Sequence, residues 1–508
     1  MKEARDPRPN ILLVVTDQQR FDTLGCYGNP HVDTPNLDKF AAGGVLFERA
    51  YCQSPVCTPS RASFLTGRYP RTTRCRANGQ SMPPYERLIS RVLADHGYYC
   101  GLAGKLHLAP CGPNACPIYE KRIDDGFVEF HWAHNPSGIG NDGLPESGGT
   151  YWSGNEYSHW LFQRGVEYKC TDYDKMGYVK IGMDEENHFT RWCMDQAIHW
   201  IRYSAEEKRK MPHFSSPPWF YNINIFDPHH AFDPPKRLLD KYLARADSLP
   251  LPNYLPGEWE DKTVFQRLDH AHAYNNTSTP HHFCFDEMTP EDHRNIKAAY
   301  YAMVELIDIQ FGRLMAALEE SGEIDNTIVV FTSDHGEMLG DHGIYLKGPY
   351  FYEGMAHVPL IVSWKGHFTP GVRLQTLTEL TDLAPTFEEL CLGEIEPGVQ
   401  GRSLTGVLTG RQDPASHRDS VYCEYYEAMP WHTQPEAHGT MVFDGRYKLS
   451  RFHTSKEGEL YDLQADPGEL RNLWADPAHS QVKIRMLELL ADRMADTVDP
   501  LPLATDKW

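Results

Sequence analysis

The segment Cys57-Thr58-Pro59-Ser60-Arg61 combines a sulfur nucleophile, a helix start and a fixed cation. Pro59 fits the first turn of a helix, and Thr58 fits the cap position just before it. Gly67 is suited to ending that helix. We therefore expect Cys57 at the mouth of a helix N-terminus, where N–H groups and the helix dipole attract anions. Arg61, one turn into the helix, could hold an oxyanion bidentately. The alternative interpretation is that Cys57 is an ordinary buried cysteine before a helix.

Three short apolar runs are typical of buried parallel strands, and each ends in ionisable residues. These runs are residues 11–16 before Asp17, residues 219–226 before Asp227-Pro228-His229, and residues 327–333 before Asp334-His335. In open α/β sheets, ligands bind outside the carboxyl ends of the strands. Three strands with ionisable residues at these ends therefore predict one shared site.

Helical patterns separate these strands, which predicts an α/β fold. The clearest helix begins at Thr289-Pro290, carries an apolar stripe at helical spacing, and ends at Ser321-Gly322. The composition shifts near residues 392–414, and the chain beyond reads as short strands with an Asp444-Gly445 hairpin turn and a helix over 481–494. We expect a large catalytic domain over residues 1–400 and a smaller domain of antiparallel sheet plus helix over residues 415–508.

The overall charge and the cysteine pattern limit the partners and the compartment. A formal net charge of -21 argues against nucleic acid or an anionic membrane as the main partner. The apolar run at residues 11–15 is too short for an export signal or a membrane span, so we expect a cytoplasmic protein. The 12 cysteines show no disulfide spacing.

Two irregular regions and the C-terminal tail are candidates for contacts with other molecules. Residues 111–158 and 233–280 are expected to form long loops that face the substrate. Residues 499–508 could serve as an assembly arm of a homo-oligomer, with a frayed end as the alternative.

Several longer motifs occur in a fixed order along the chain. They are residues 54–70 around Cys57, Gly104-Lys105-Leu106-His107-Leu108, residues 334–340, Glu459-Leu460-Tyr461-Asp462-Leu463, and the later Asp466-Pro467 and Asn472-Leu473. Together they resemble the signature of type I sulfatases in the alkaline phosphatase superfamily. The resemblance implies an alkaline-phosphatase-like fold, with a large mixed sheet flanked by helices and a smaller C-terminal α+β subdomain.

The resemblance also implies a modified nucleophile at position 57. In this family the matching cysteine is converted to formylglycine, so a formylglycine-generating enzyme is an expected partner. One hydroxyl of the hydrated aldehyde attacks sulfur, and the other, once deprotonated, collapses to the aldehyde and expels sulfate. A thiol could attack but could not leave in this way. The implied activity is hydrolysis of a small-molecule sulfate ester.

A metal site is implied at the strand ends. Asp17, Gln18, Asp334 and His335 match the family's ligand positions, with residue 57 beside them. Many sulfatases have an acid in place of Gln18 and an asparagine in place of His335, and the pattern here is more similar to the phosphonate monoester hydrolase and choline sulfatase branches. One divalent cation is expected; Ca²⁺ is our first choice, and the imidazole makes Mn²⁺ credible.

Cationic and imidazole side chains complete the implied site. Lys105 and His107 match residues that contact the sulfate, and Lys347 matches the lysine between substrate oxygen and leaving group. His229 matches the histidine near the leaving oxygen, and its Pro-His context favours it over His230.

Two further residues and two rival functions follow from the same resemblance. Arg61 is expected to steady the formylglycine hydrate, and Asn78 to donate a hydrogen bond to the substrate. The Lys105/His107 pair favours a sulfate monoester, with phosphonate monoester or phosphodiester hydrolysis as the alternative. A catalytically dead, anion-binding relative is the other alternative, and the intact set Cys57, Arg61, Lys105, His229 and Lys347 argues against it.

Overall fold

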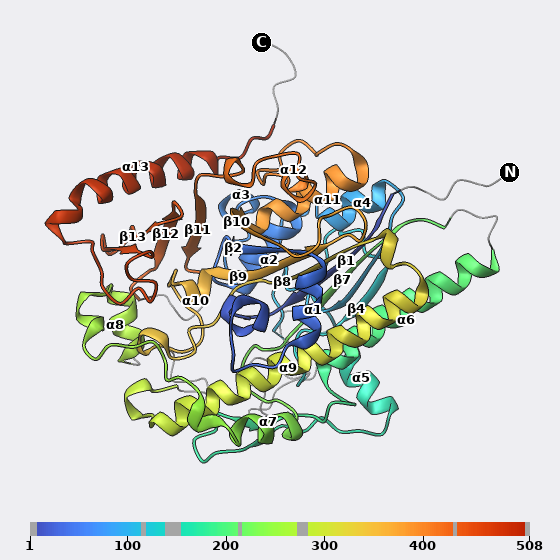
Figure 1. The fold of residues 1–508 in the computed structure, drawn as a ribbon, viewed down its shortest axis with the longest axis horizontal. Coiled ribbons are helices and arrows are strands. Elements are labelled where there is room, and N and C mark those ends of the chain that lie inside the picture. Colours follow the sequence, from blue (N-terminus) through green and yellow to red (C-terminus); the bar gives the residue numbers. More distant parts are fainter. Residues whose placement is uncertain are drawn as a thin grey trace, which may run out of the picture.

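A computed structural model describes residues 8–112, 118–137, 154–211, 216–271, 283–429 and 434–502. Its centre is an eight-stranded sheet in the order β10-β2-β9-β8-β1-β7-β3-β4 (Figure 1). The strands are β1 (Asn10–Thr16), β2 (Val45–Tyr51), β3 (Tyr99–Gly104), β4 (Glu129–Trp132), β7 (Trp219–Ile225), β8 (Thr327–Ser333), β9 (His357–Ser363) and β10 (Val372–Glu379). Only β9 runs antiparallel to its neighbours, so the sheet is mixed, as predicted. Strands β5 (Thr171–Asp172) and β6 (Lys180–Ile181) form a separate pair.

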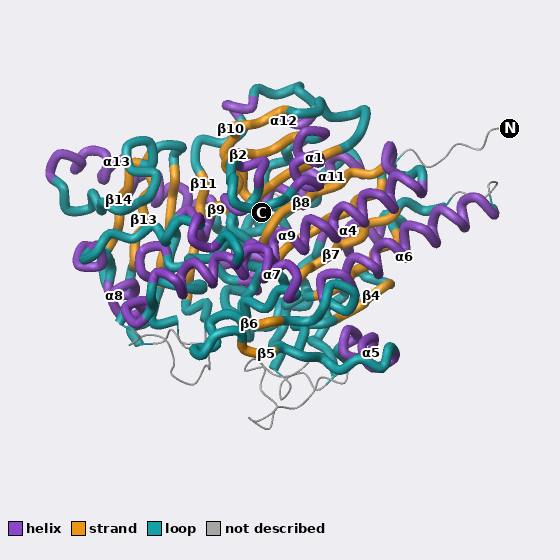
Figure 2. Tube along the Cα trace, turned by 60° about the horizontal axis from the view of Figure 1, so that its bottom comes forward, coloured by secondary structure: helices purple, strands orange, loops and turns teal. Residues whose placement is uncertain are grey.

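Helices cover both faces of this sheet (Figure 1, Figure 2). One face carries α1 (Pro35–Gly43), α6 (Phe189–Lys210), α7 (Lys236–Leu243) and α9 (Pro290–Ser321), and the other carries α2 (Cys57–Thr66), α4 (Ile89–Asp95) and α11 (Leu383–Leu392). Alternate residues of β1 supply both cores: Leu12 and Val14 pack with the α6 and α9 side, Leu13 and Val15 with the α2 side. A strand buried on both faces explains the unbroken apolar run in the sequence.

The three strands predicted to share a site lie side by side. Strand β1 pairs in parallel with β7 and β8, so Thr16 lies opposite Ile225 and Ser333. The residues that follow these strands therefore emerge at one edge of the sheet. The predicted long helix is also confirmed as α9, which begins in a capping box between Thr289 and Asp292.

A second, four-stranded antiparallel sheet forms the C-terminal part. Its strands are β11 (Val421–Tyr426), β12 (His438–Phe443), β13 (Tyr447–Phe452) and β14 (Gly458–Asp462), and α13 (Ser480–Asp496) packs on it. Figure 1 shows this sheet and α13 beside the main sheet. The remaining helices are α3 (Pro70–Thr73), α5 (Glu156–Gln163), α8 (Val264–His270), α10 (Glu353–Ala356) and α12 (Thr405–Leu408).

The two regions expected to be irregular contain regular elements among the residues that are described. The first region contains β4 and the beginning of α5, and the second contains α7 and α8. Residues 113–117, 138–153 and 272–282 of these regions lie outside the described residues. In the tail, Asp499 forms an ion pair with Arg68 at 2.9 Å, while residues 503–508 are likewise outside.

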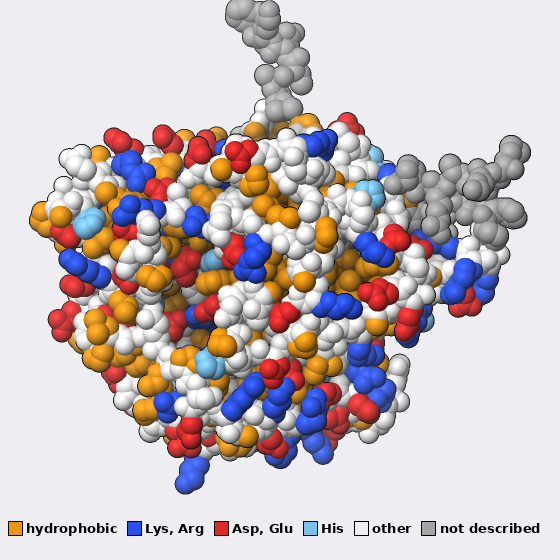
Figure 3. Space-filling model, viewed as in Figure 1, with side chains coloured by type: hydrophobic (Ala, Val, Ile, Leu, Met, Phe, Trp, Pro, Cys, Tyr) orange, Lys and Arg blue, Asp and Glu red, His pale blue; other side chains and the backbone are white. Residues whose placement is uncertain are grey.

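Three further features of the fold are the state of its cysteines, the character of its helices and the distribution of its surface charge. Eleven cysteines within the described ranges are all free thiols. Among the same residues, no helix has both the length and the apolar character needed to cross a bilayer. Figure 3 shows acidic and basic side chains interspersed over one face of the molecule.

Candidate active site

Cys57 is the first residue of α2 and its side chain is buried. The predicted cap at Thr58 is wrong: Val56 occupies the N-cap position, and the Thr58 N–H donates to Asn78 Oδ1 at 3.0 Å. A side chain from another segment thus does the work of a local cap. The predicted end of the helix is confirmed, because Gly67 adopts the left-handed conformation with φ 67°.

Four buried donor groups surround this helix start. Cys57 Sγ lies 3.2 Å from His335 Nε2 and 3.6 Å from Asp17 Oδ1. One donor atom from each of Asp17, Cys57, Asp334 and His335 lies within 4.8 Å of the others. His335 Nδ1 lies 2.8 Å from the Gly336 carbonyl and donates its proton there, so in the neutral ring Nε2 presents a lone pair to the cluster. The ends of β1 and β8 and the start of α2 therefore bring together four of the five residues predicted at the metal site.

Gln18 stands beside this cluster in a constrained conformation. Its backbone has φ 66°, and its N–H donates to Asp334 Oδ1 at 3.0 Å. Its side-chain nitrogen donates to Glu337, while its Oε1 is buried without a hydrogen-bond partner. An unpaired buried carbonyl oxygen is costly, and a cation would satisfy it. Two carboxylates, an amide oxygen and an imidazole fit Ca²⁺ or Mn²⁺.

Buried cations neutralise the two carboxylates. Arg61 pairs with Asp334 through Nε at 2.9 Å and with Asp17 through a terminal nitrogen at 3.2 Å. Lys105 Nζ lies 2.6 Å from Asp17 Oδ2. Burial alone would raise the pKa of Asp17, but Lys105 and the neighbouring cations outweigh it and hold that pKa well below its usual value. Asp17 is therefore ionised and available to a metal ion.

Two lysines also flank the nucleophile position. Lys347 Nζ lies 2.9 Å from Cys57 Sγ, and Lys105 Nζ lies 3.7 Å from the same sulfur. Burial and Asp17 act to raise the pKa of Cys57, but Lys105, Lys347 and His335 reverse this and lower it. The surroundings thus stabilise a negative charge at this position.

His229 completes the contact with Lys347. Lys347 Nζ donates to His229 Nε2 at 2.9 Å, and burial together with Lys347 holds the pKa of His229 well below its usual value. The neighbouring His230 stacks on His229 and lies 3.4 Å from the Gln18 amide nitrogen. The structure therefore places His229, the preferred residue of the pair, next to Lys347, which in turn contacts Cys57.

His107 and Asn78, the other two predicted substrate contacts, bond to neighbouring protein groups and, within the part of the chain that the structure describes, not to Cys57. The backbone N–H of His107 donates to Glu120 at 2.7 Å, and the His107 ring packs edge-on against His134 with centroids 4.6 Å apart. Burial, followed by the charge of Lys105, holds the pKa of His107 well below its usual value. Asn78 contacts the start of α2 through the Thr58 N–H.

Sequence reasoning missed His134, Glu120 and Glu337. His134 follows β4 within a stretch that we expected to be irregular, and no motif marks it. Its pKa is lowered by burial first and then by Lys105, so it lies within the field of the site. Only the pairing of β3 with β4 brings it close, and a contact of that range leaves no local signal in the sequence.

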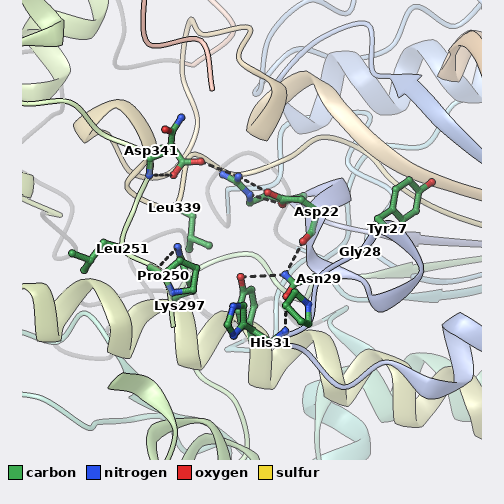
Figure 4. A pocket seen from close by; sticks show the side chains of 14 residues that line it. Asp22, Tyr27, Gly28, Asn29, His31, Pro250, Leu251, Lys297, Leu339 and Asp341 are labelled. Carbon is green, nitrogen blue, oxygen red and sulfur yellow. Dashed lines mark hydrogen bonds and ion pairs between the residues drawn. The ribbon is translucent and has the colours of Figure 1, made fainter. Parts of the chain in front are cut away.

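A cavity of about 310 Å³ lies apart from this cluster (Figure 4). Its lining includes Lys297 and Arg20, and Figure 4 shows Asp22 and Asp341 joined through one side chain by ion pairs. That side chain is Arg20, which also donates to the Glu337 carbonyl at 3.0 Å. The cavity thus borders the loop that follows β8, and Arg20 stabilises that loop through its contacts with Glu337 and Asp341.

A family model described as Sulfatase matches residues 9–393. The chain belongs to the sulfatase family. A second model, described as N-sulphoglucosamine sulphohydrolase, C-terminal, matches residues 340–496 of this sulfatase. The predicted membership of the type I sulfatases, in the alkaline phosphatase superfamily, is confirmed, and the protein is a sulfuric ester hydrolase.

Relatives and solved structures agree with this assignment. The sulfatase is 31% identical over 475 residues to an arylsulfatase of Clostridium perfringens, covering 92% of this chain and 90% of the relative. It is 27% identical over 479 residues to a choline-sulfatase of Rhizobium meliloti, covering 92% and 83%. A phosphonate monoester hydrolase from Silicibacter pomeroyi matches its structure with a TM-score of 0.76 at 27% identity, covering 97% and 96%.

Proposed function

We propose that this sulfatase cleaves a sulfate monoester with residue 57, as formylglycine, acting as the nucleophile beside one divalent metal ion. The observation that carries the proposal is the position of Cys57 Sγ, 2.9 Å from Lys347 Nζ and 3.2 Å from His335 Nε2. A buried helix start placed among cations favours an anionic nucleophile and an anionic substrate. A formylglycine-generating enzyme is then a required partner of the chain.

Two groups would complete the site. A formylglycine hydrate supplies geminal hydroxyls, one to attack sulfur and one to release the adduct. A divalent cation supplies Lewis-acid activation and charge neutralisation, and Asp17, Gln18, Asp334 and His335 would hold it. The unpaired Oε1 of Gln18 and the donor atoms within 4.8 Å of one another support this choice of ligands.

The remaining residues bind the substrate and manage its charge. A sulfate monoester has three terminal oxygens, and Lys105 and Lys347 approach the nucleophile position as two cationic donors. Arg61 offsets one of the two carboxylate charges, and a bound divalent cation would offset the remainder, so Lys105 and Lys347 would keep positive charge for the substrate. The Lys347–His229 hydrogen bond holds a proton where the leaving oxygen would depart.

Phosphonate monoester hydrolysis is the second candidate, favoured by the structural match at a TM-score of 0.76. A phosphonate monoester or phosphodiester has only two terminal oxygens and needs fewer donors. The buried ammonium of Lys105 and the imidazole of His107 therefore favour the sulfate ester. We infer that phosphorus esters are secondary substrates.

A substrate comparison tests this ranking. We expect a higher kcat/KM for a nitrophenyl sulfate than for a nitrophenyl phosphonate or phosphodiester. Lys105→Thr should lower the sulfate value by about 10²–10³-fold, as loss of one donor to a developing charge does, and the phosphonate value by less. Lys236→Thr, at an exposed lysine paired with Asp240, is the control. A preference for phosphorus esters in the unaltered enzyme would reverse the proposal.

A further inference from the structure

Beside the active site, two imidazoles and a thiol converge in a buried cluster. One donor atom from each of His107, Cys111 and His134 lies within 4.8 Å of the others. The three residues are 7%, 5% and 6% exposed. His107 Nδ1 is buried and has no hydrogen-bond partner among the described residues. Only His107 of the three belongs to the residues proposed above to contact sulfate.

The fold builds this cluster from two neighbouring strands. Strands β3 and β4 pair in parallel with Gly104 opposite Trp132, so the segments that follow them run past the same sheet edge. His107 follows the first strand by three residues, and His134 follows the second by two. The convergence is thus a product of the sheet register, supported by the Ala133 N–H that donates to the Gly104 carbonyl at 3.2 Å.

A single buried carboxylate ties the three ligand-bearing segments together. Glu120 Oε2 accepts from the His107 N–H at 2.7 Å and from Trp132 Nε1 at 2.8 Å, and it lies 3.6 Å from Cys111 Sγ. Its other oxygen accepts from the Leu108 N–H at 2.7 Å. Glu120 thus fixes the backbone at His107 and the Trp132 ring two residues before His134, and so holds the ligand-bearing segments in place.

We propose that His107, Cys111 and His134 form a second metal site that binds Zn²⁺ and thereby inhibits the enzyme. Two imidazoles and one thiolate are a ligand set that suits zinc and does not suit Ca²⁺, which prefers oxygen. Tetrahedral zinc needs ligand atoms about 3.3–3.7 Å apart, so side-chain movements of about 1 Å close the present spacing. The Cys111 thiol loses its proton to solvent as the Zn–S bond forms. Water or Glu120 Oε2 takes the fourth position.

Inhibition follows because zinc draws the His107 ring towards Cys111 and His134, and this movement takes its other ring nitrogen out of position for sulfate. This part of the inference rests on the proposed role of His107 in substrate binding, whereas zinc binding itself does not. Zinc bound here withholds one donor from the substrate while leaving the site at Asp17 and Asp334 intact. The zinc effect should therefore be competitive with the sulfate ester.

The test measures metal binding to the full-length protein without substrate and with excess Ca²⁺ present. We expect one equivalent of Zn²⁺ that Ca²⁺ does not displace, and a thiolate-to-metal charge-transfer band when Co²⁺ replaces Zn²⁺. Cys111→Ser should abolish the band and raise the Zn²⁺ Kd by at least about 100-fold, because loss of a ligand costs more than loss of an outer-shell partner. Cys391→Ser, at a buried cysteine in α11, is the matched control.

His134→Gln removes a different ligand and covers the case in which Cys111→Ser does not fold. It should weaken Zn²⁺ binding while keeping the charge-transfer band at high Co²⁺. Rates with and without Zn²⁺, each relative to the zinc-free rate of the same variant, then report the inhibition. A wild-type protein that binds no equivalent of Zn²⁺ in excess Ca²⁺, or a charge-transfer band retained in Cys111→Ser, overturns the proposal. If instead the proposed function is wrong, the zinc-free enzyme will not hydrolyse the sulfate ester, while the Co²⁺ spectrum will still show the charge-transfer band.

Discussion

Replacing Arg61 with methionine tests the electrostatic arrangement of the site. Arg61 is fully buried and bridges Asp17 and Asp334, which end two neighbouring strands. Methionine keeps much of the side-chain length and removes only the charge and the hydrogen bonds. The change therefore leaves two buried carboxylates with less compensation, while Lys105 still pairs with Asp17.

The structure sets the size of the expected effect. Removing one partner of a buried ion pair costs about 3–5 kcal/mol, because the other charge stays buried without compensation. An unfolding entropy of about 2.1 cal/mol/K per residue over 508 residues converts this cost into a fall in Tm of about 3–5 °C. Added Ca²⁺ or Mn²⁺ should narrow the gap, since a bound cation restores positive charge between the same carboxylates.

Calorimetric unfolding in chelator, with and without added metal, measures both effects. Arg237→Met is the control, because its ion pair with Glu185 is largely exposed and is worth less than about 1 kcal/mol. If Arg61→Met lowers Tm no more than Arg237→Met does, the reasoning about the buried charges is wrong. A fall in Tm that added metal does not reduce would refute the ligand assignment instead.

Three further predictions concern proton transfer, metal and pH. Lys347→Met should lower kcat for aryl sulfates by about 10²–10³-fold, and more for poorer leaving groups; an equal loss across a leaving-group series would contradict its role with His229. Dialysis against a chelator should abolish activity, and Ca²⁺ or Mn²⁺ should restore it; full activity with no metal by elemental analysis would refute the metal site. Burial lowers the pKa of His131, but Glu129 and Glu156 outweigh it and raise that pKa to about 9. Since the folded pKa exceeds the unfolded value near 6.5, the stabilisation is complete below about 6.5 and is lost as pH rises through about 9. The Tm gap between wild type and His131→Gln should therefore close by about pH 10, and a constant gap would argue against this pairing.

The parts of the fold with local signals could be predicted from the sequence. Strands β1, β7 and β8 are unbroken apolar runs, and their ends fix where Asp17 and Asp334 emerge. The cap at Thr289 and the terminating Gly322 predict both ends of helix α9. Because parallel neighbouring strands end at the same edge, these local patterns also predicted one shared site.

Features that depend on distant partners could not be predicted. The N–H of Thr58 is satisfied by Asn78, so the local cap signal misplaced the start of α2. Helix α7 has no cap signal and gains stability from Leu238 and Leu239, both fully buried in the core that includes α9. His134 reaches the site only through the pairing of β3 with β4.

The most direct test of the central claim is the mass of the peptide that contains residue 57, taken from a preparation that hydrolyses a nitrophenyl sulfate. We expect the mass of formylglycine at this position and reaction of the peptide with a hydrazide reagent. The fraction converted should track the specific activity of different preparations. An active preparation in which residue 57 is uniformly an unmodified cysteine would contradict the account.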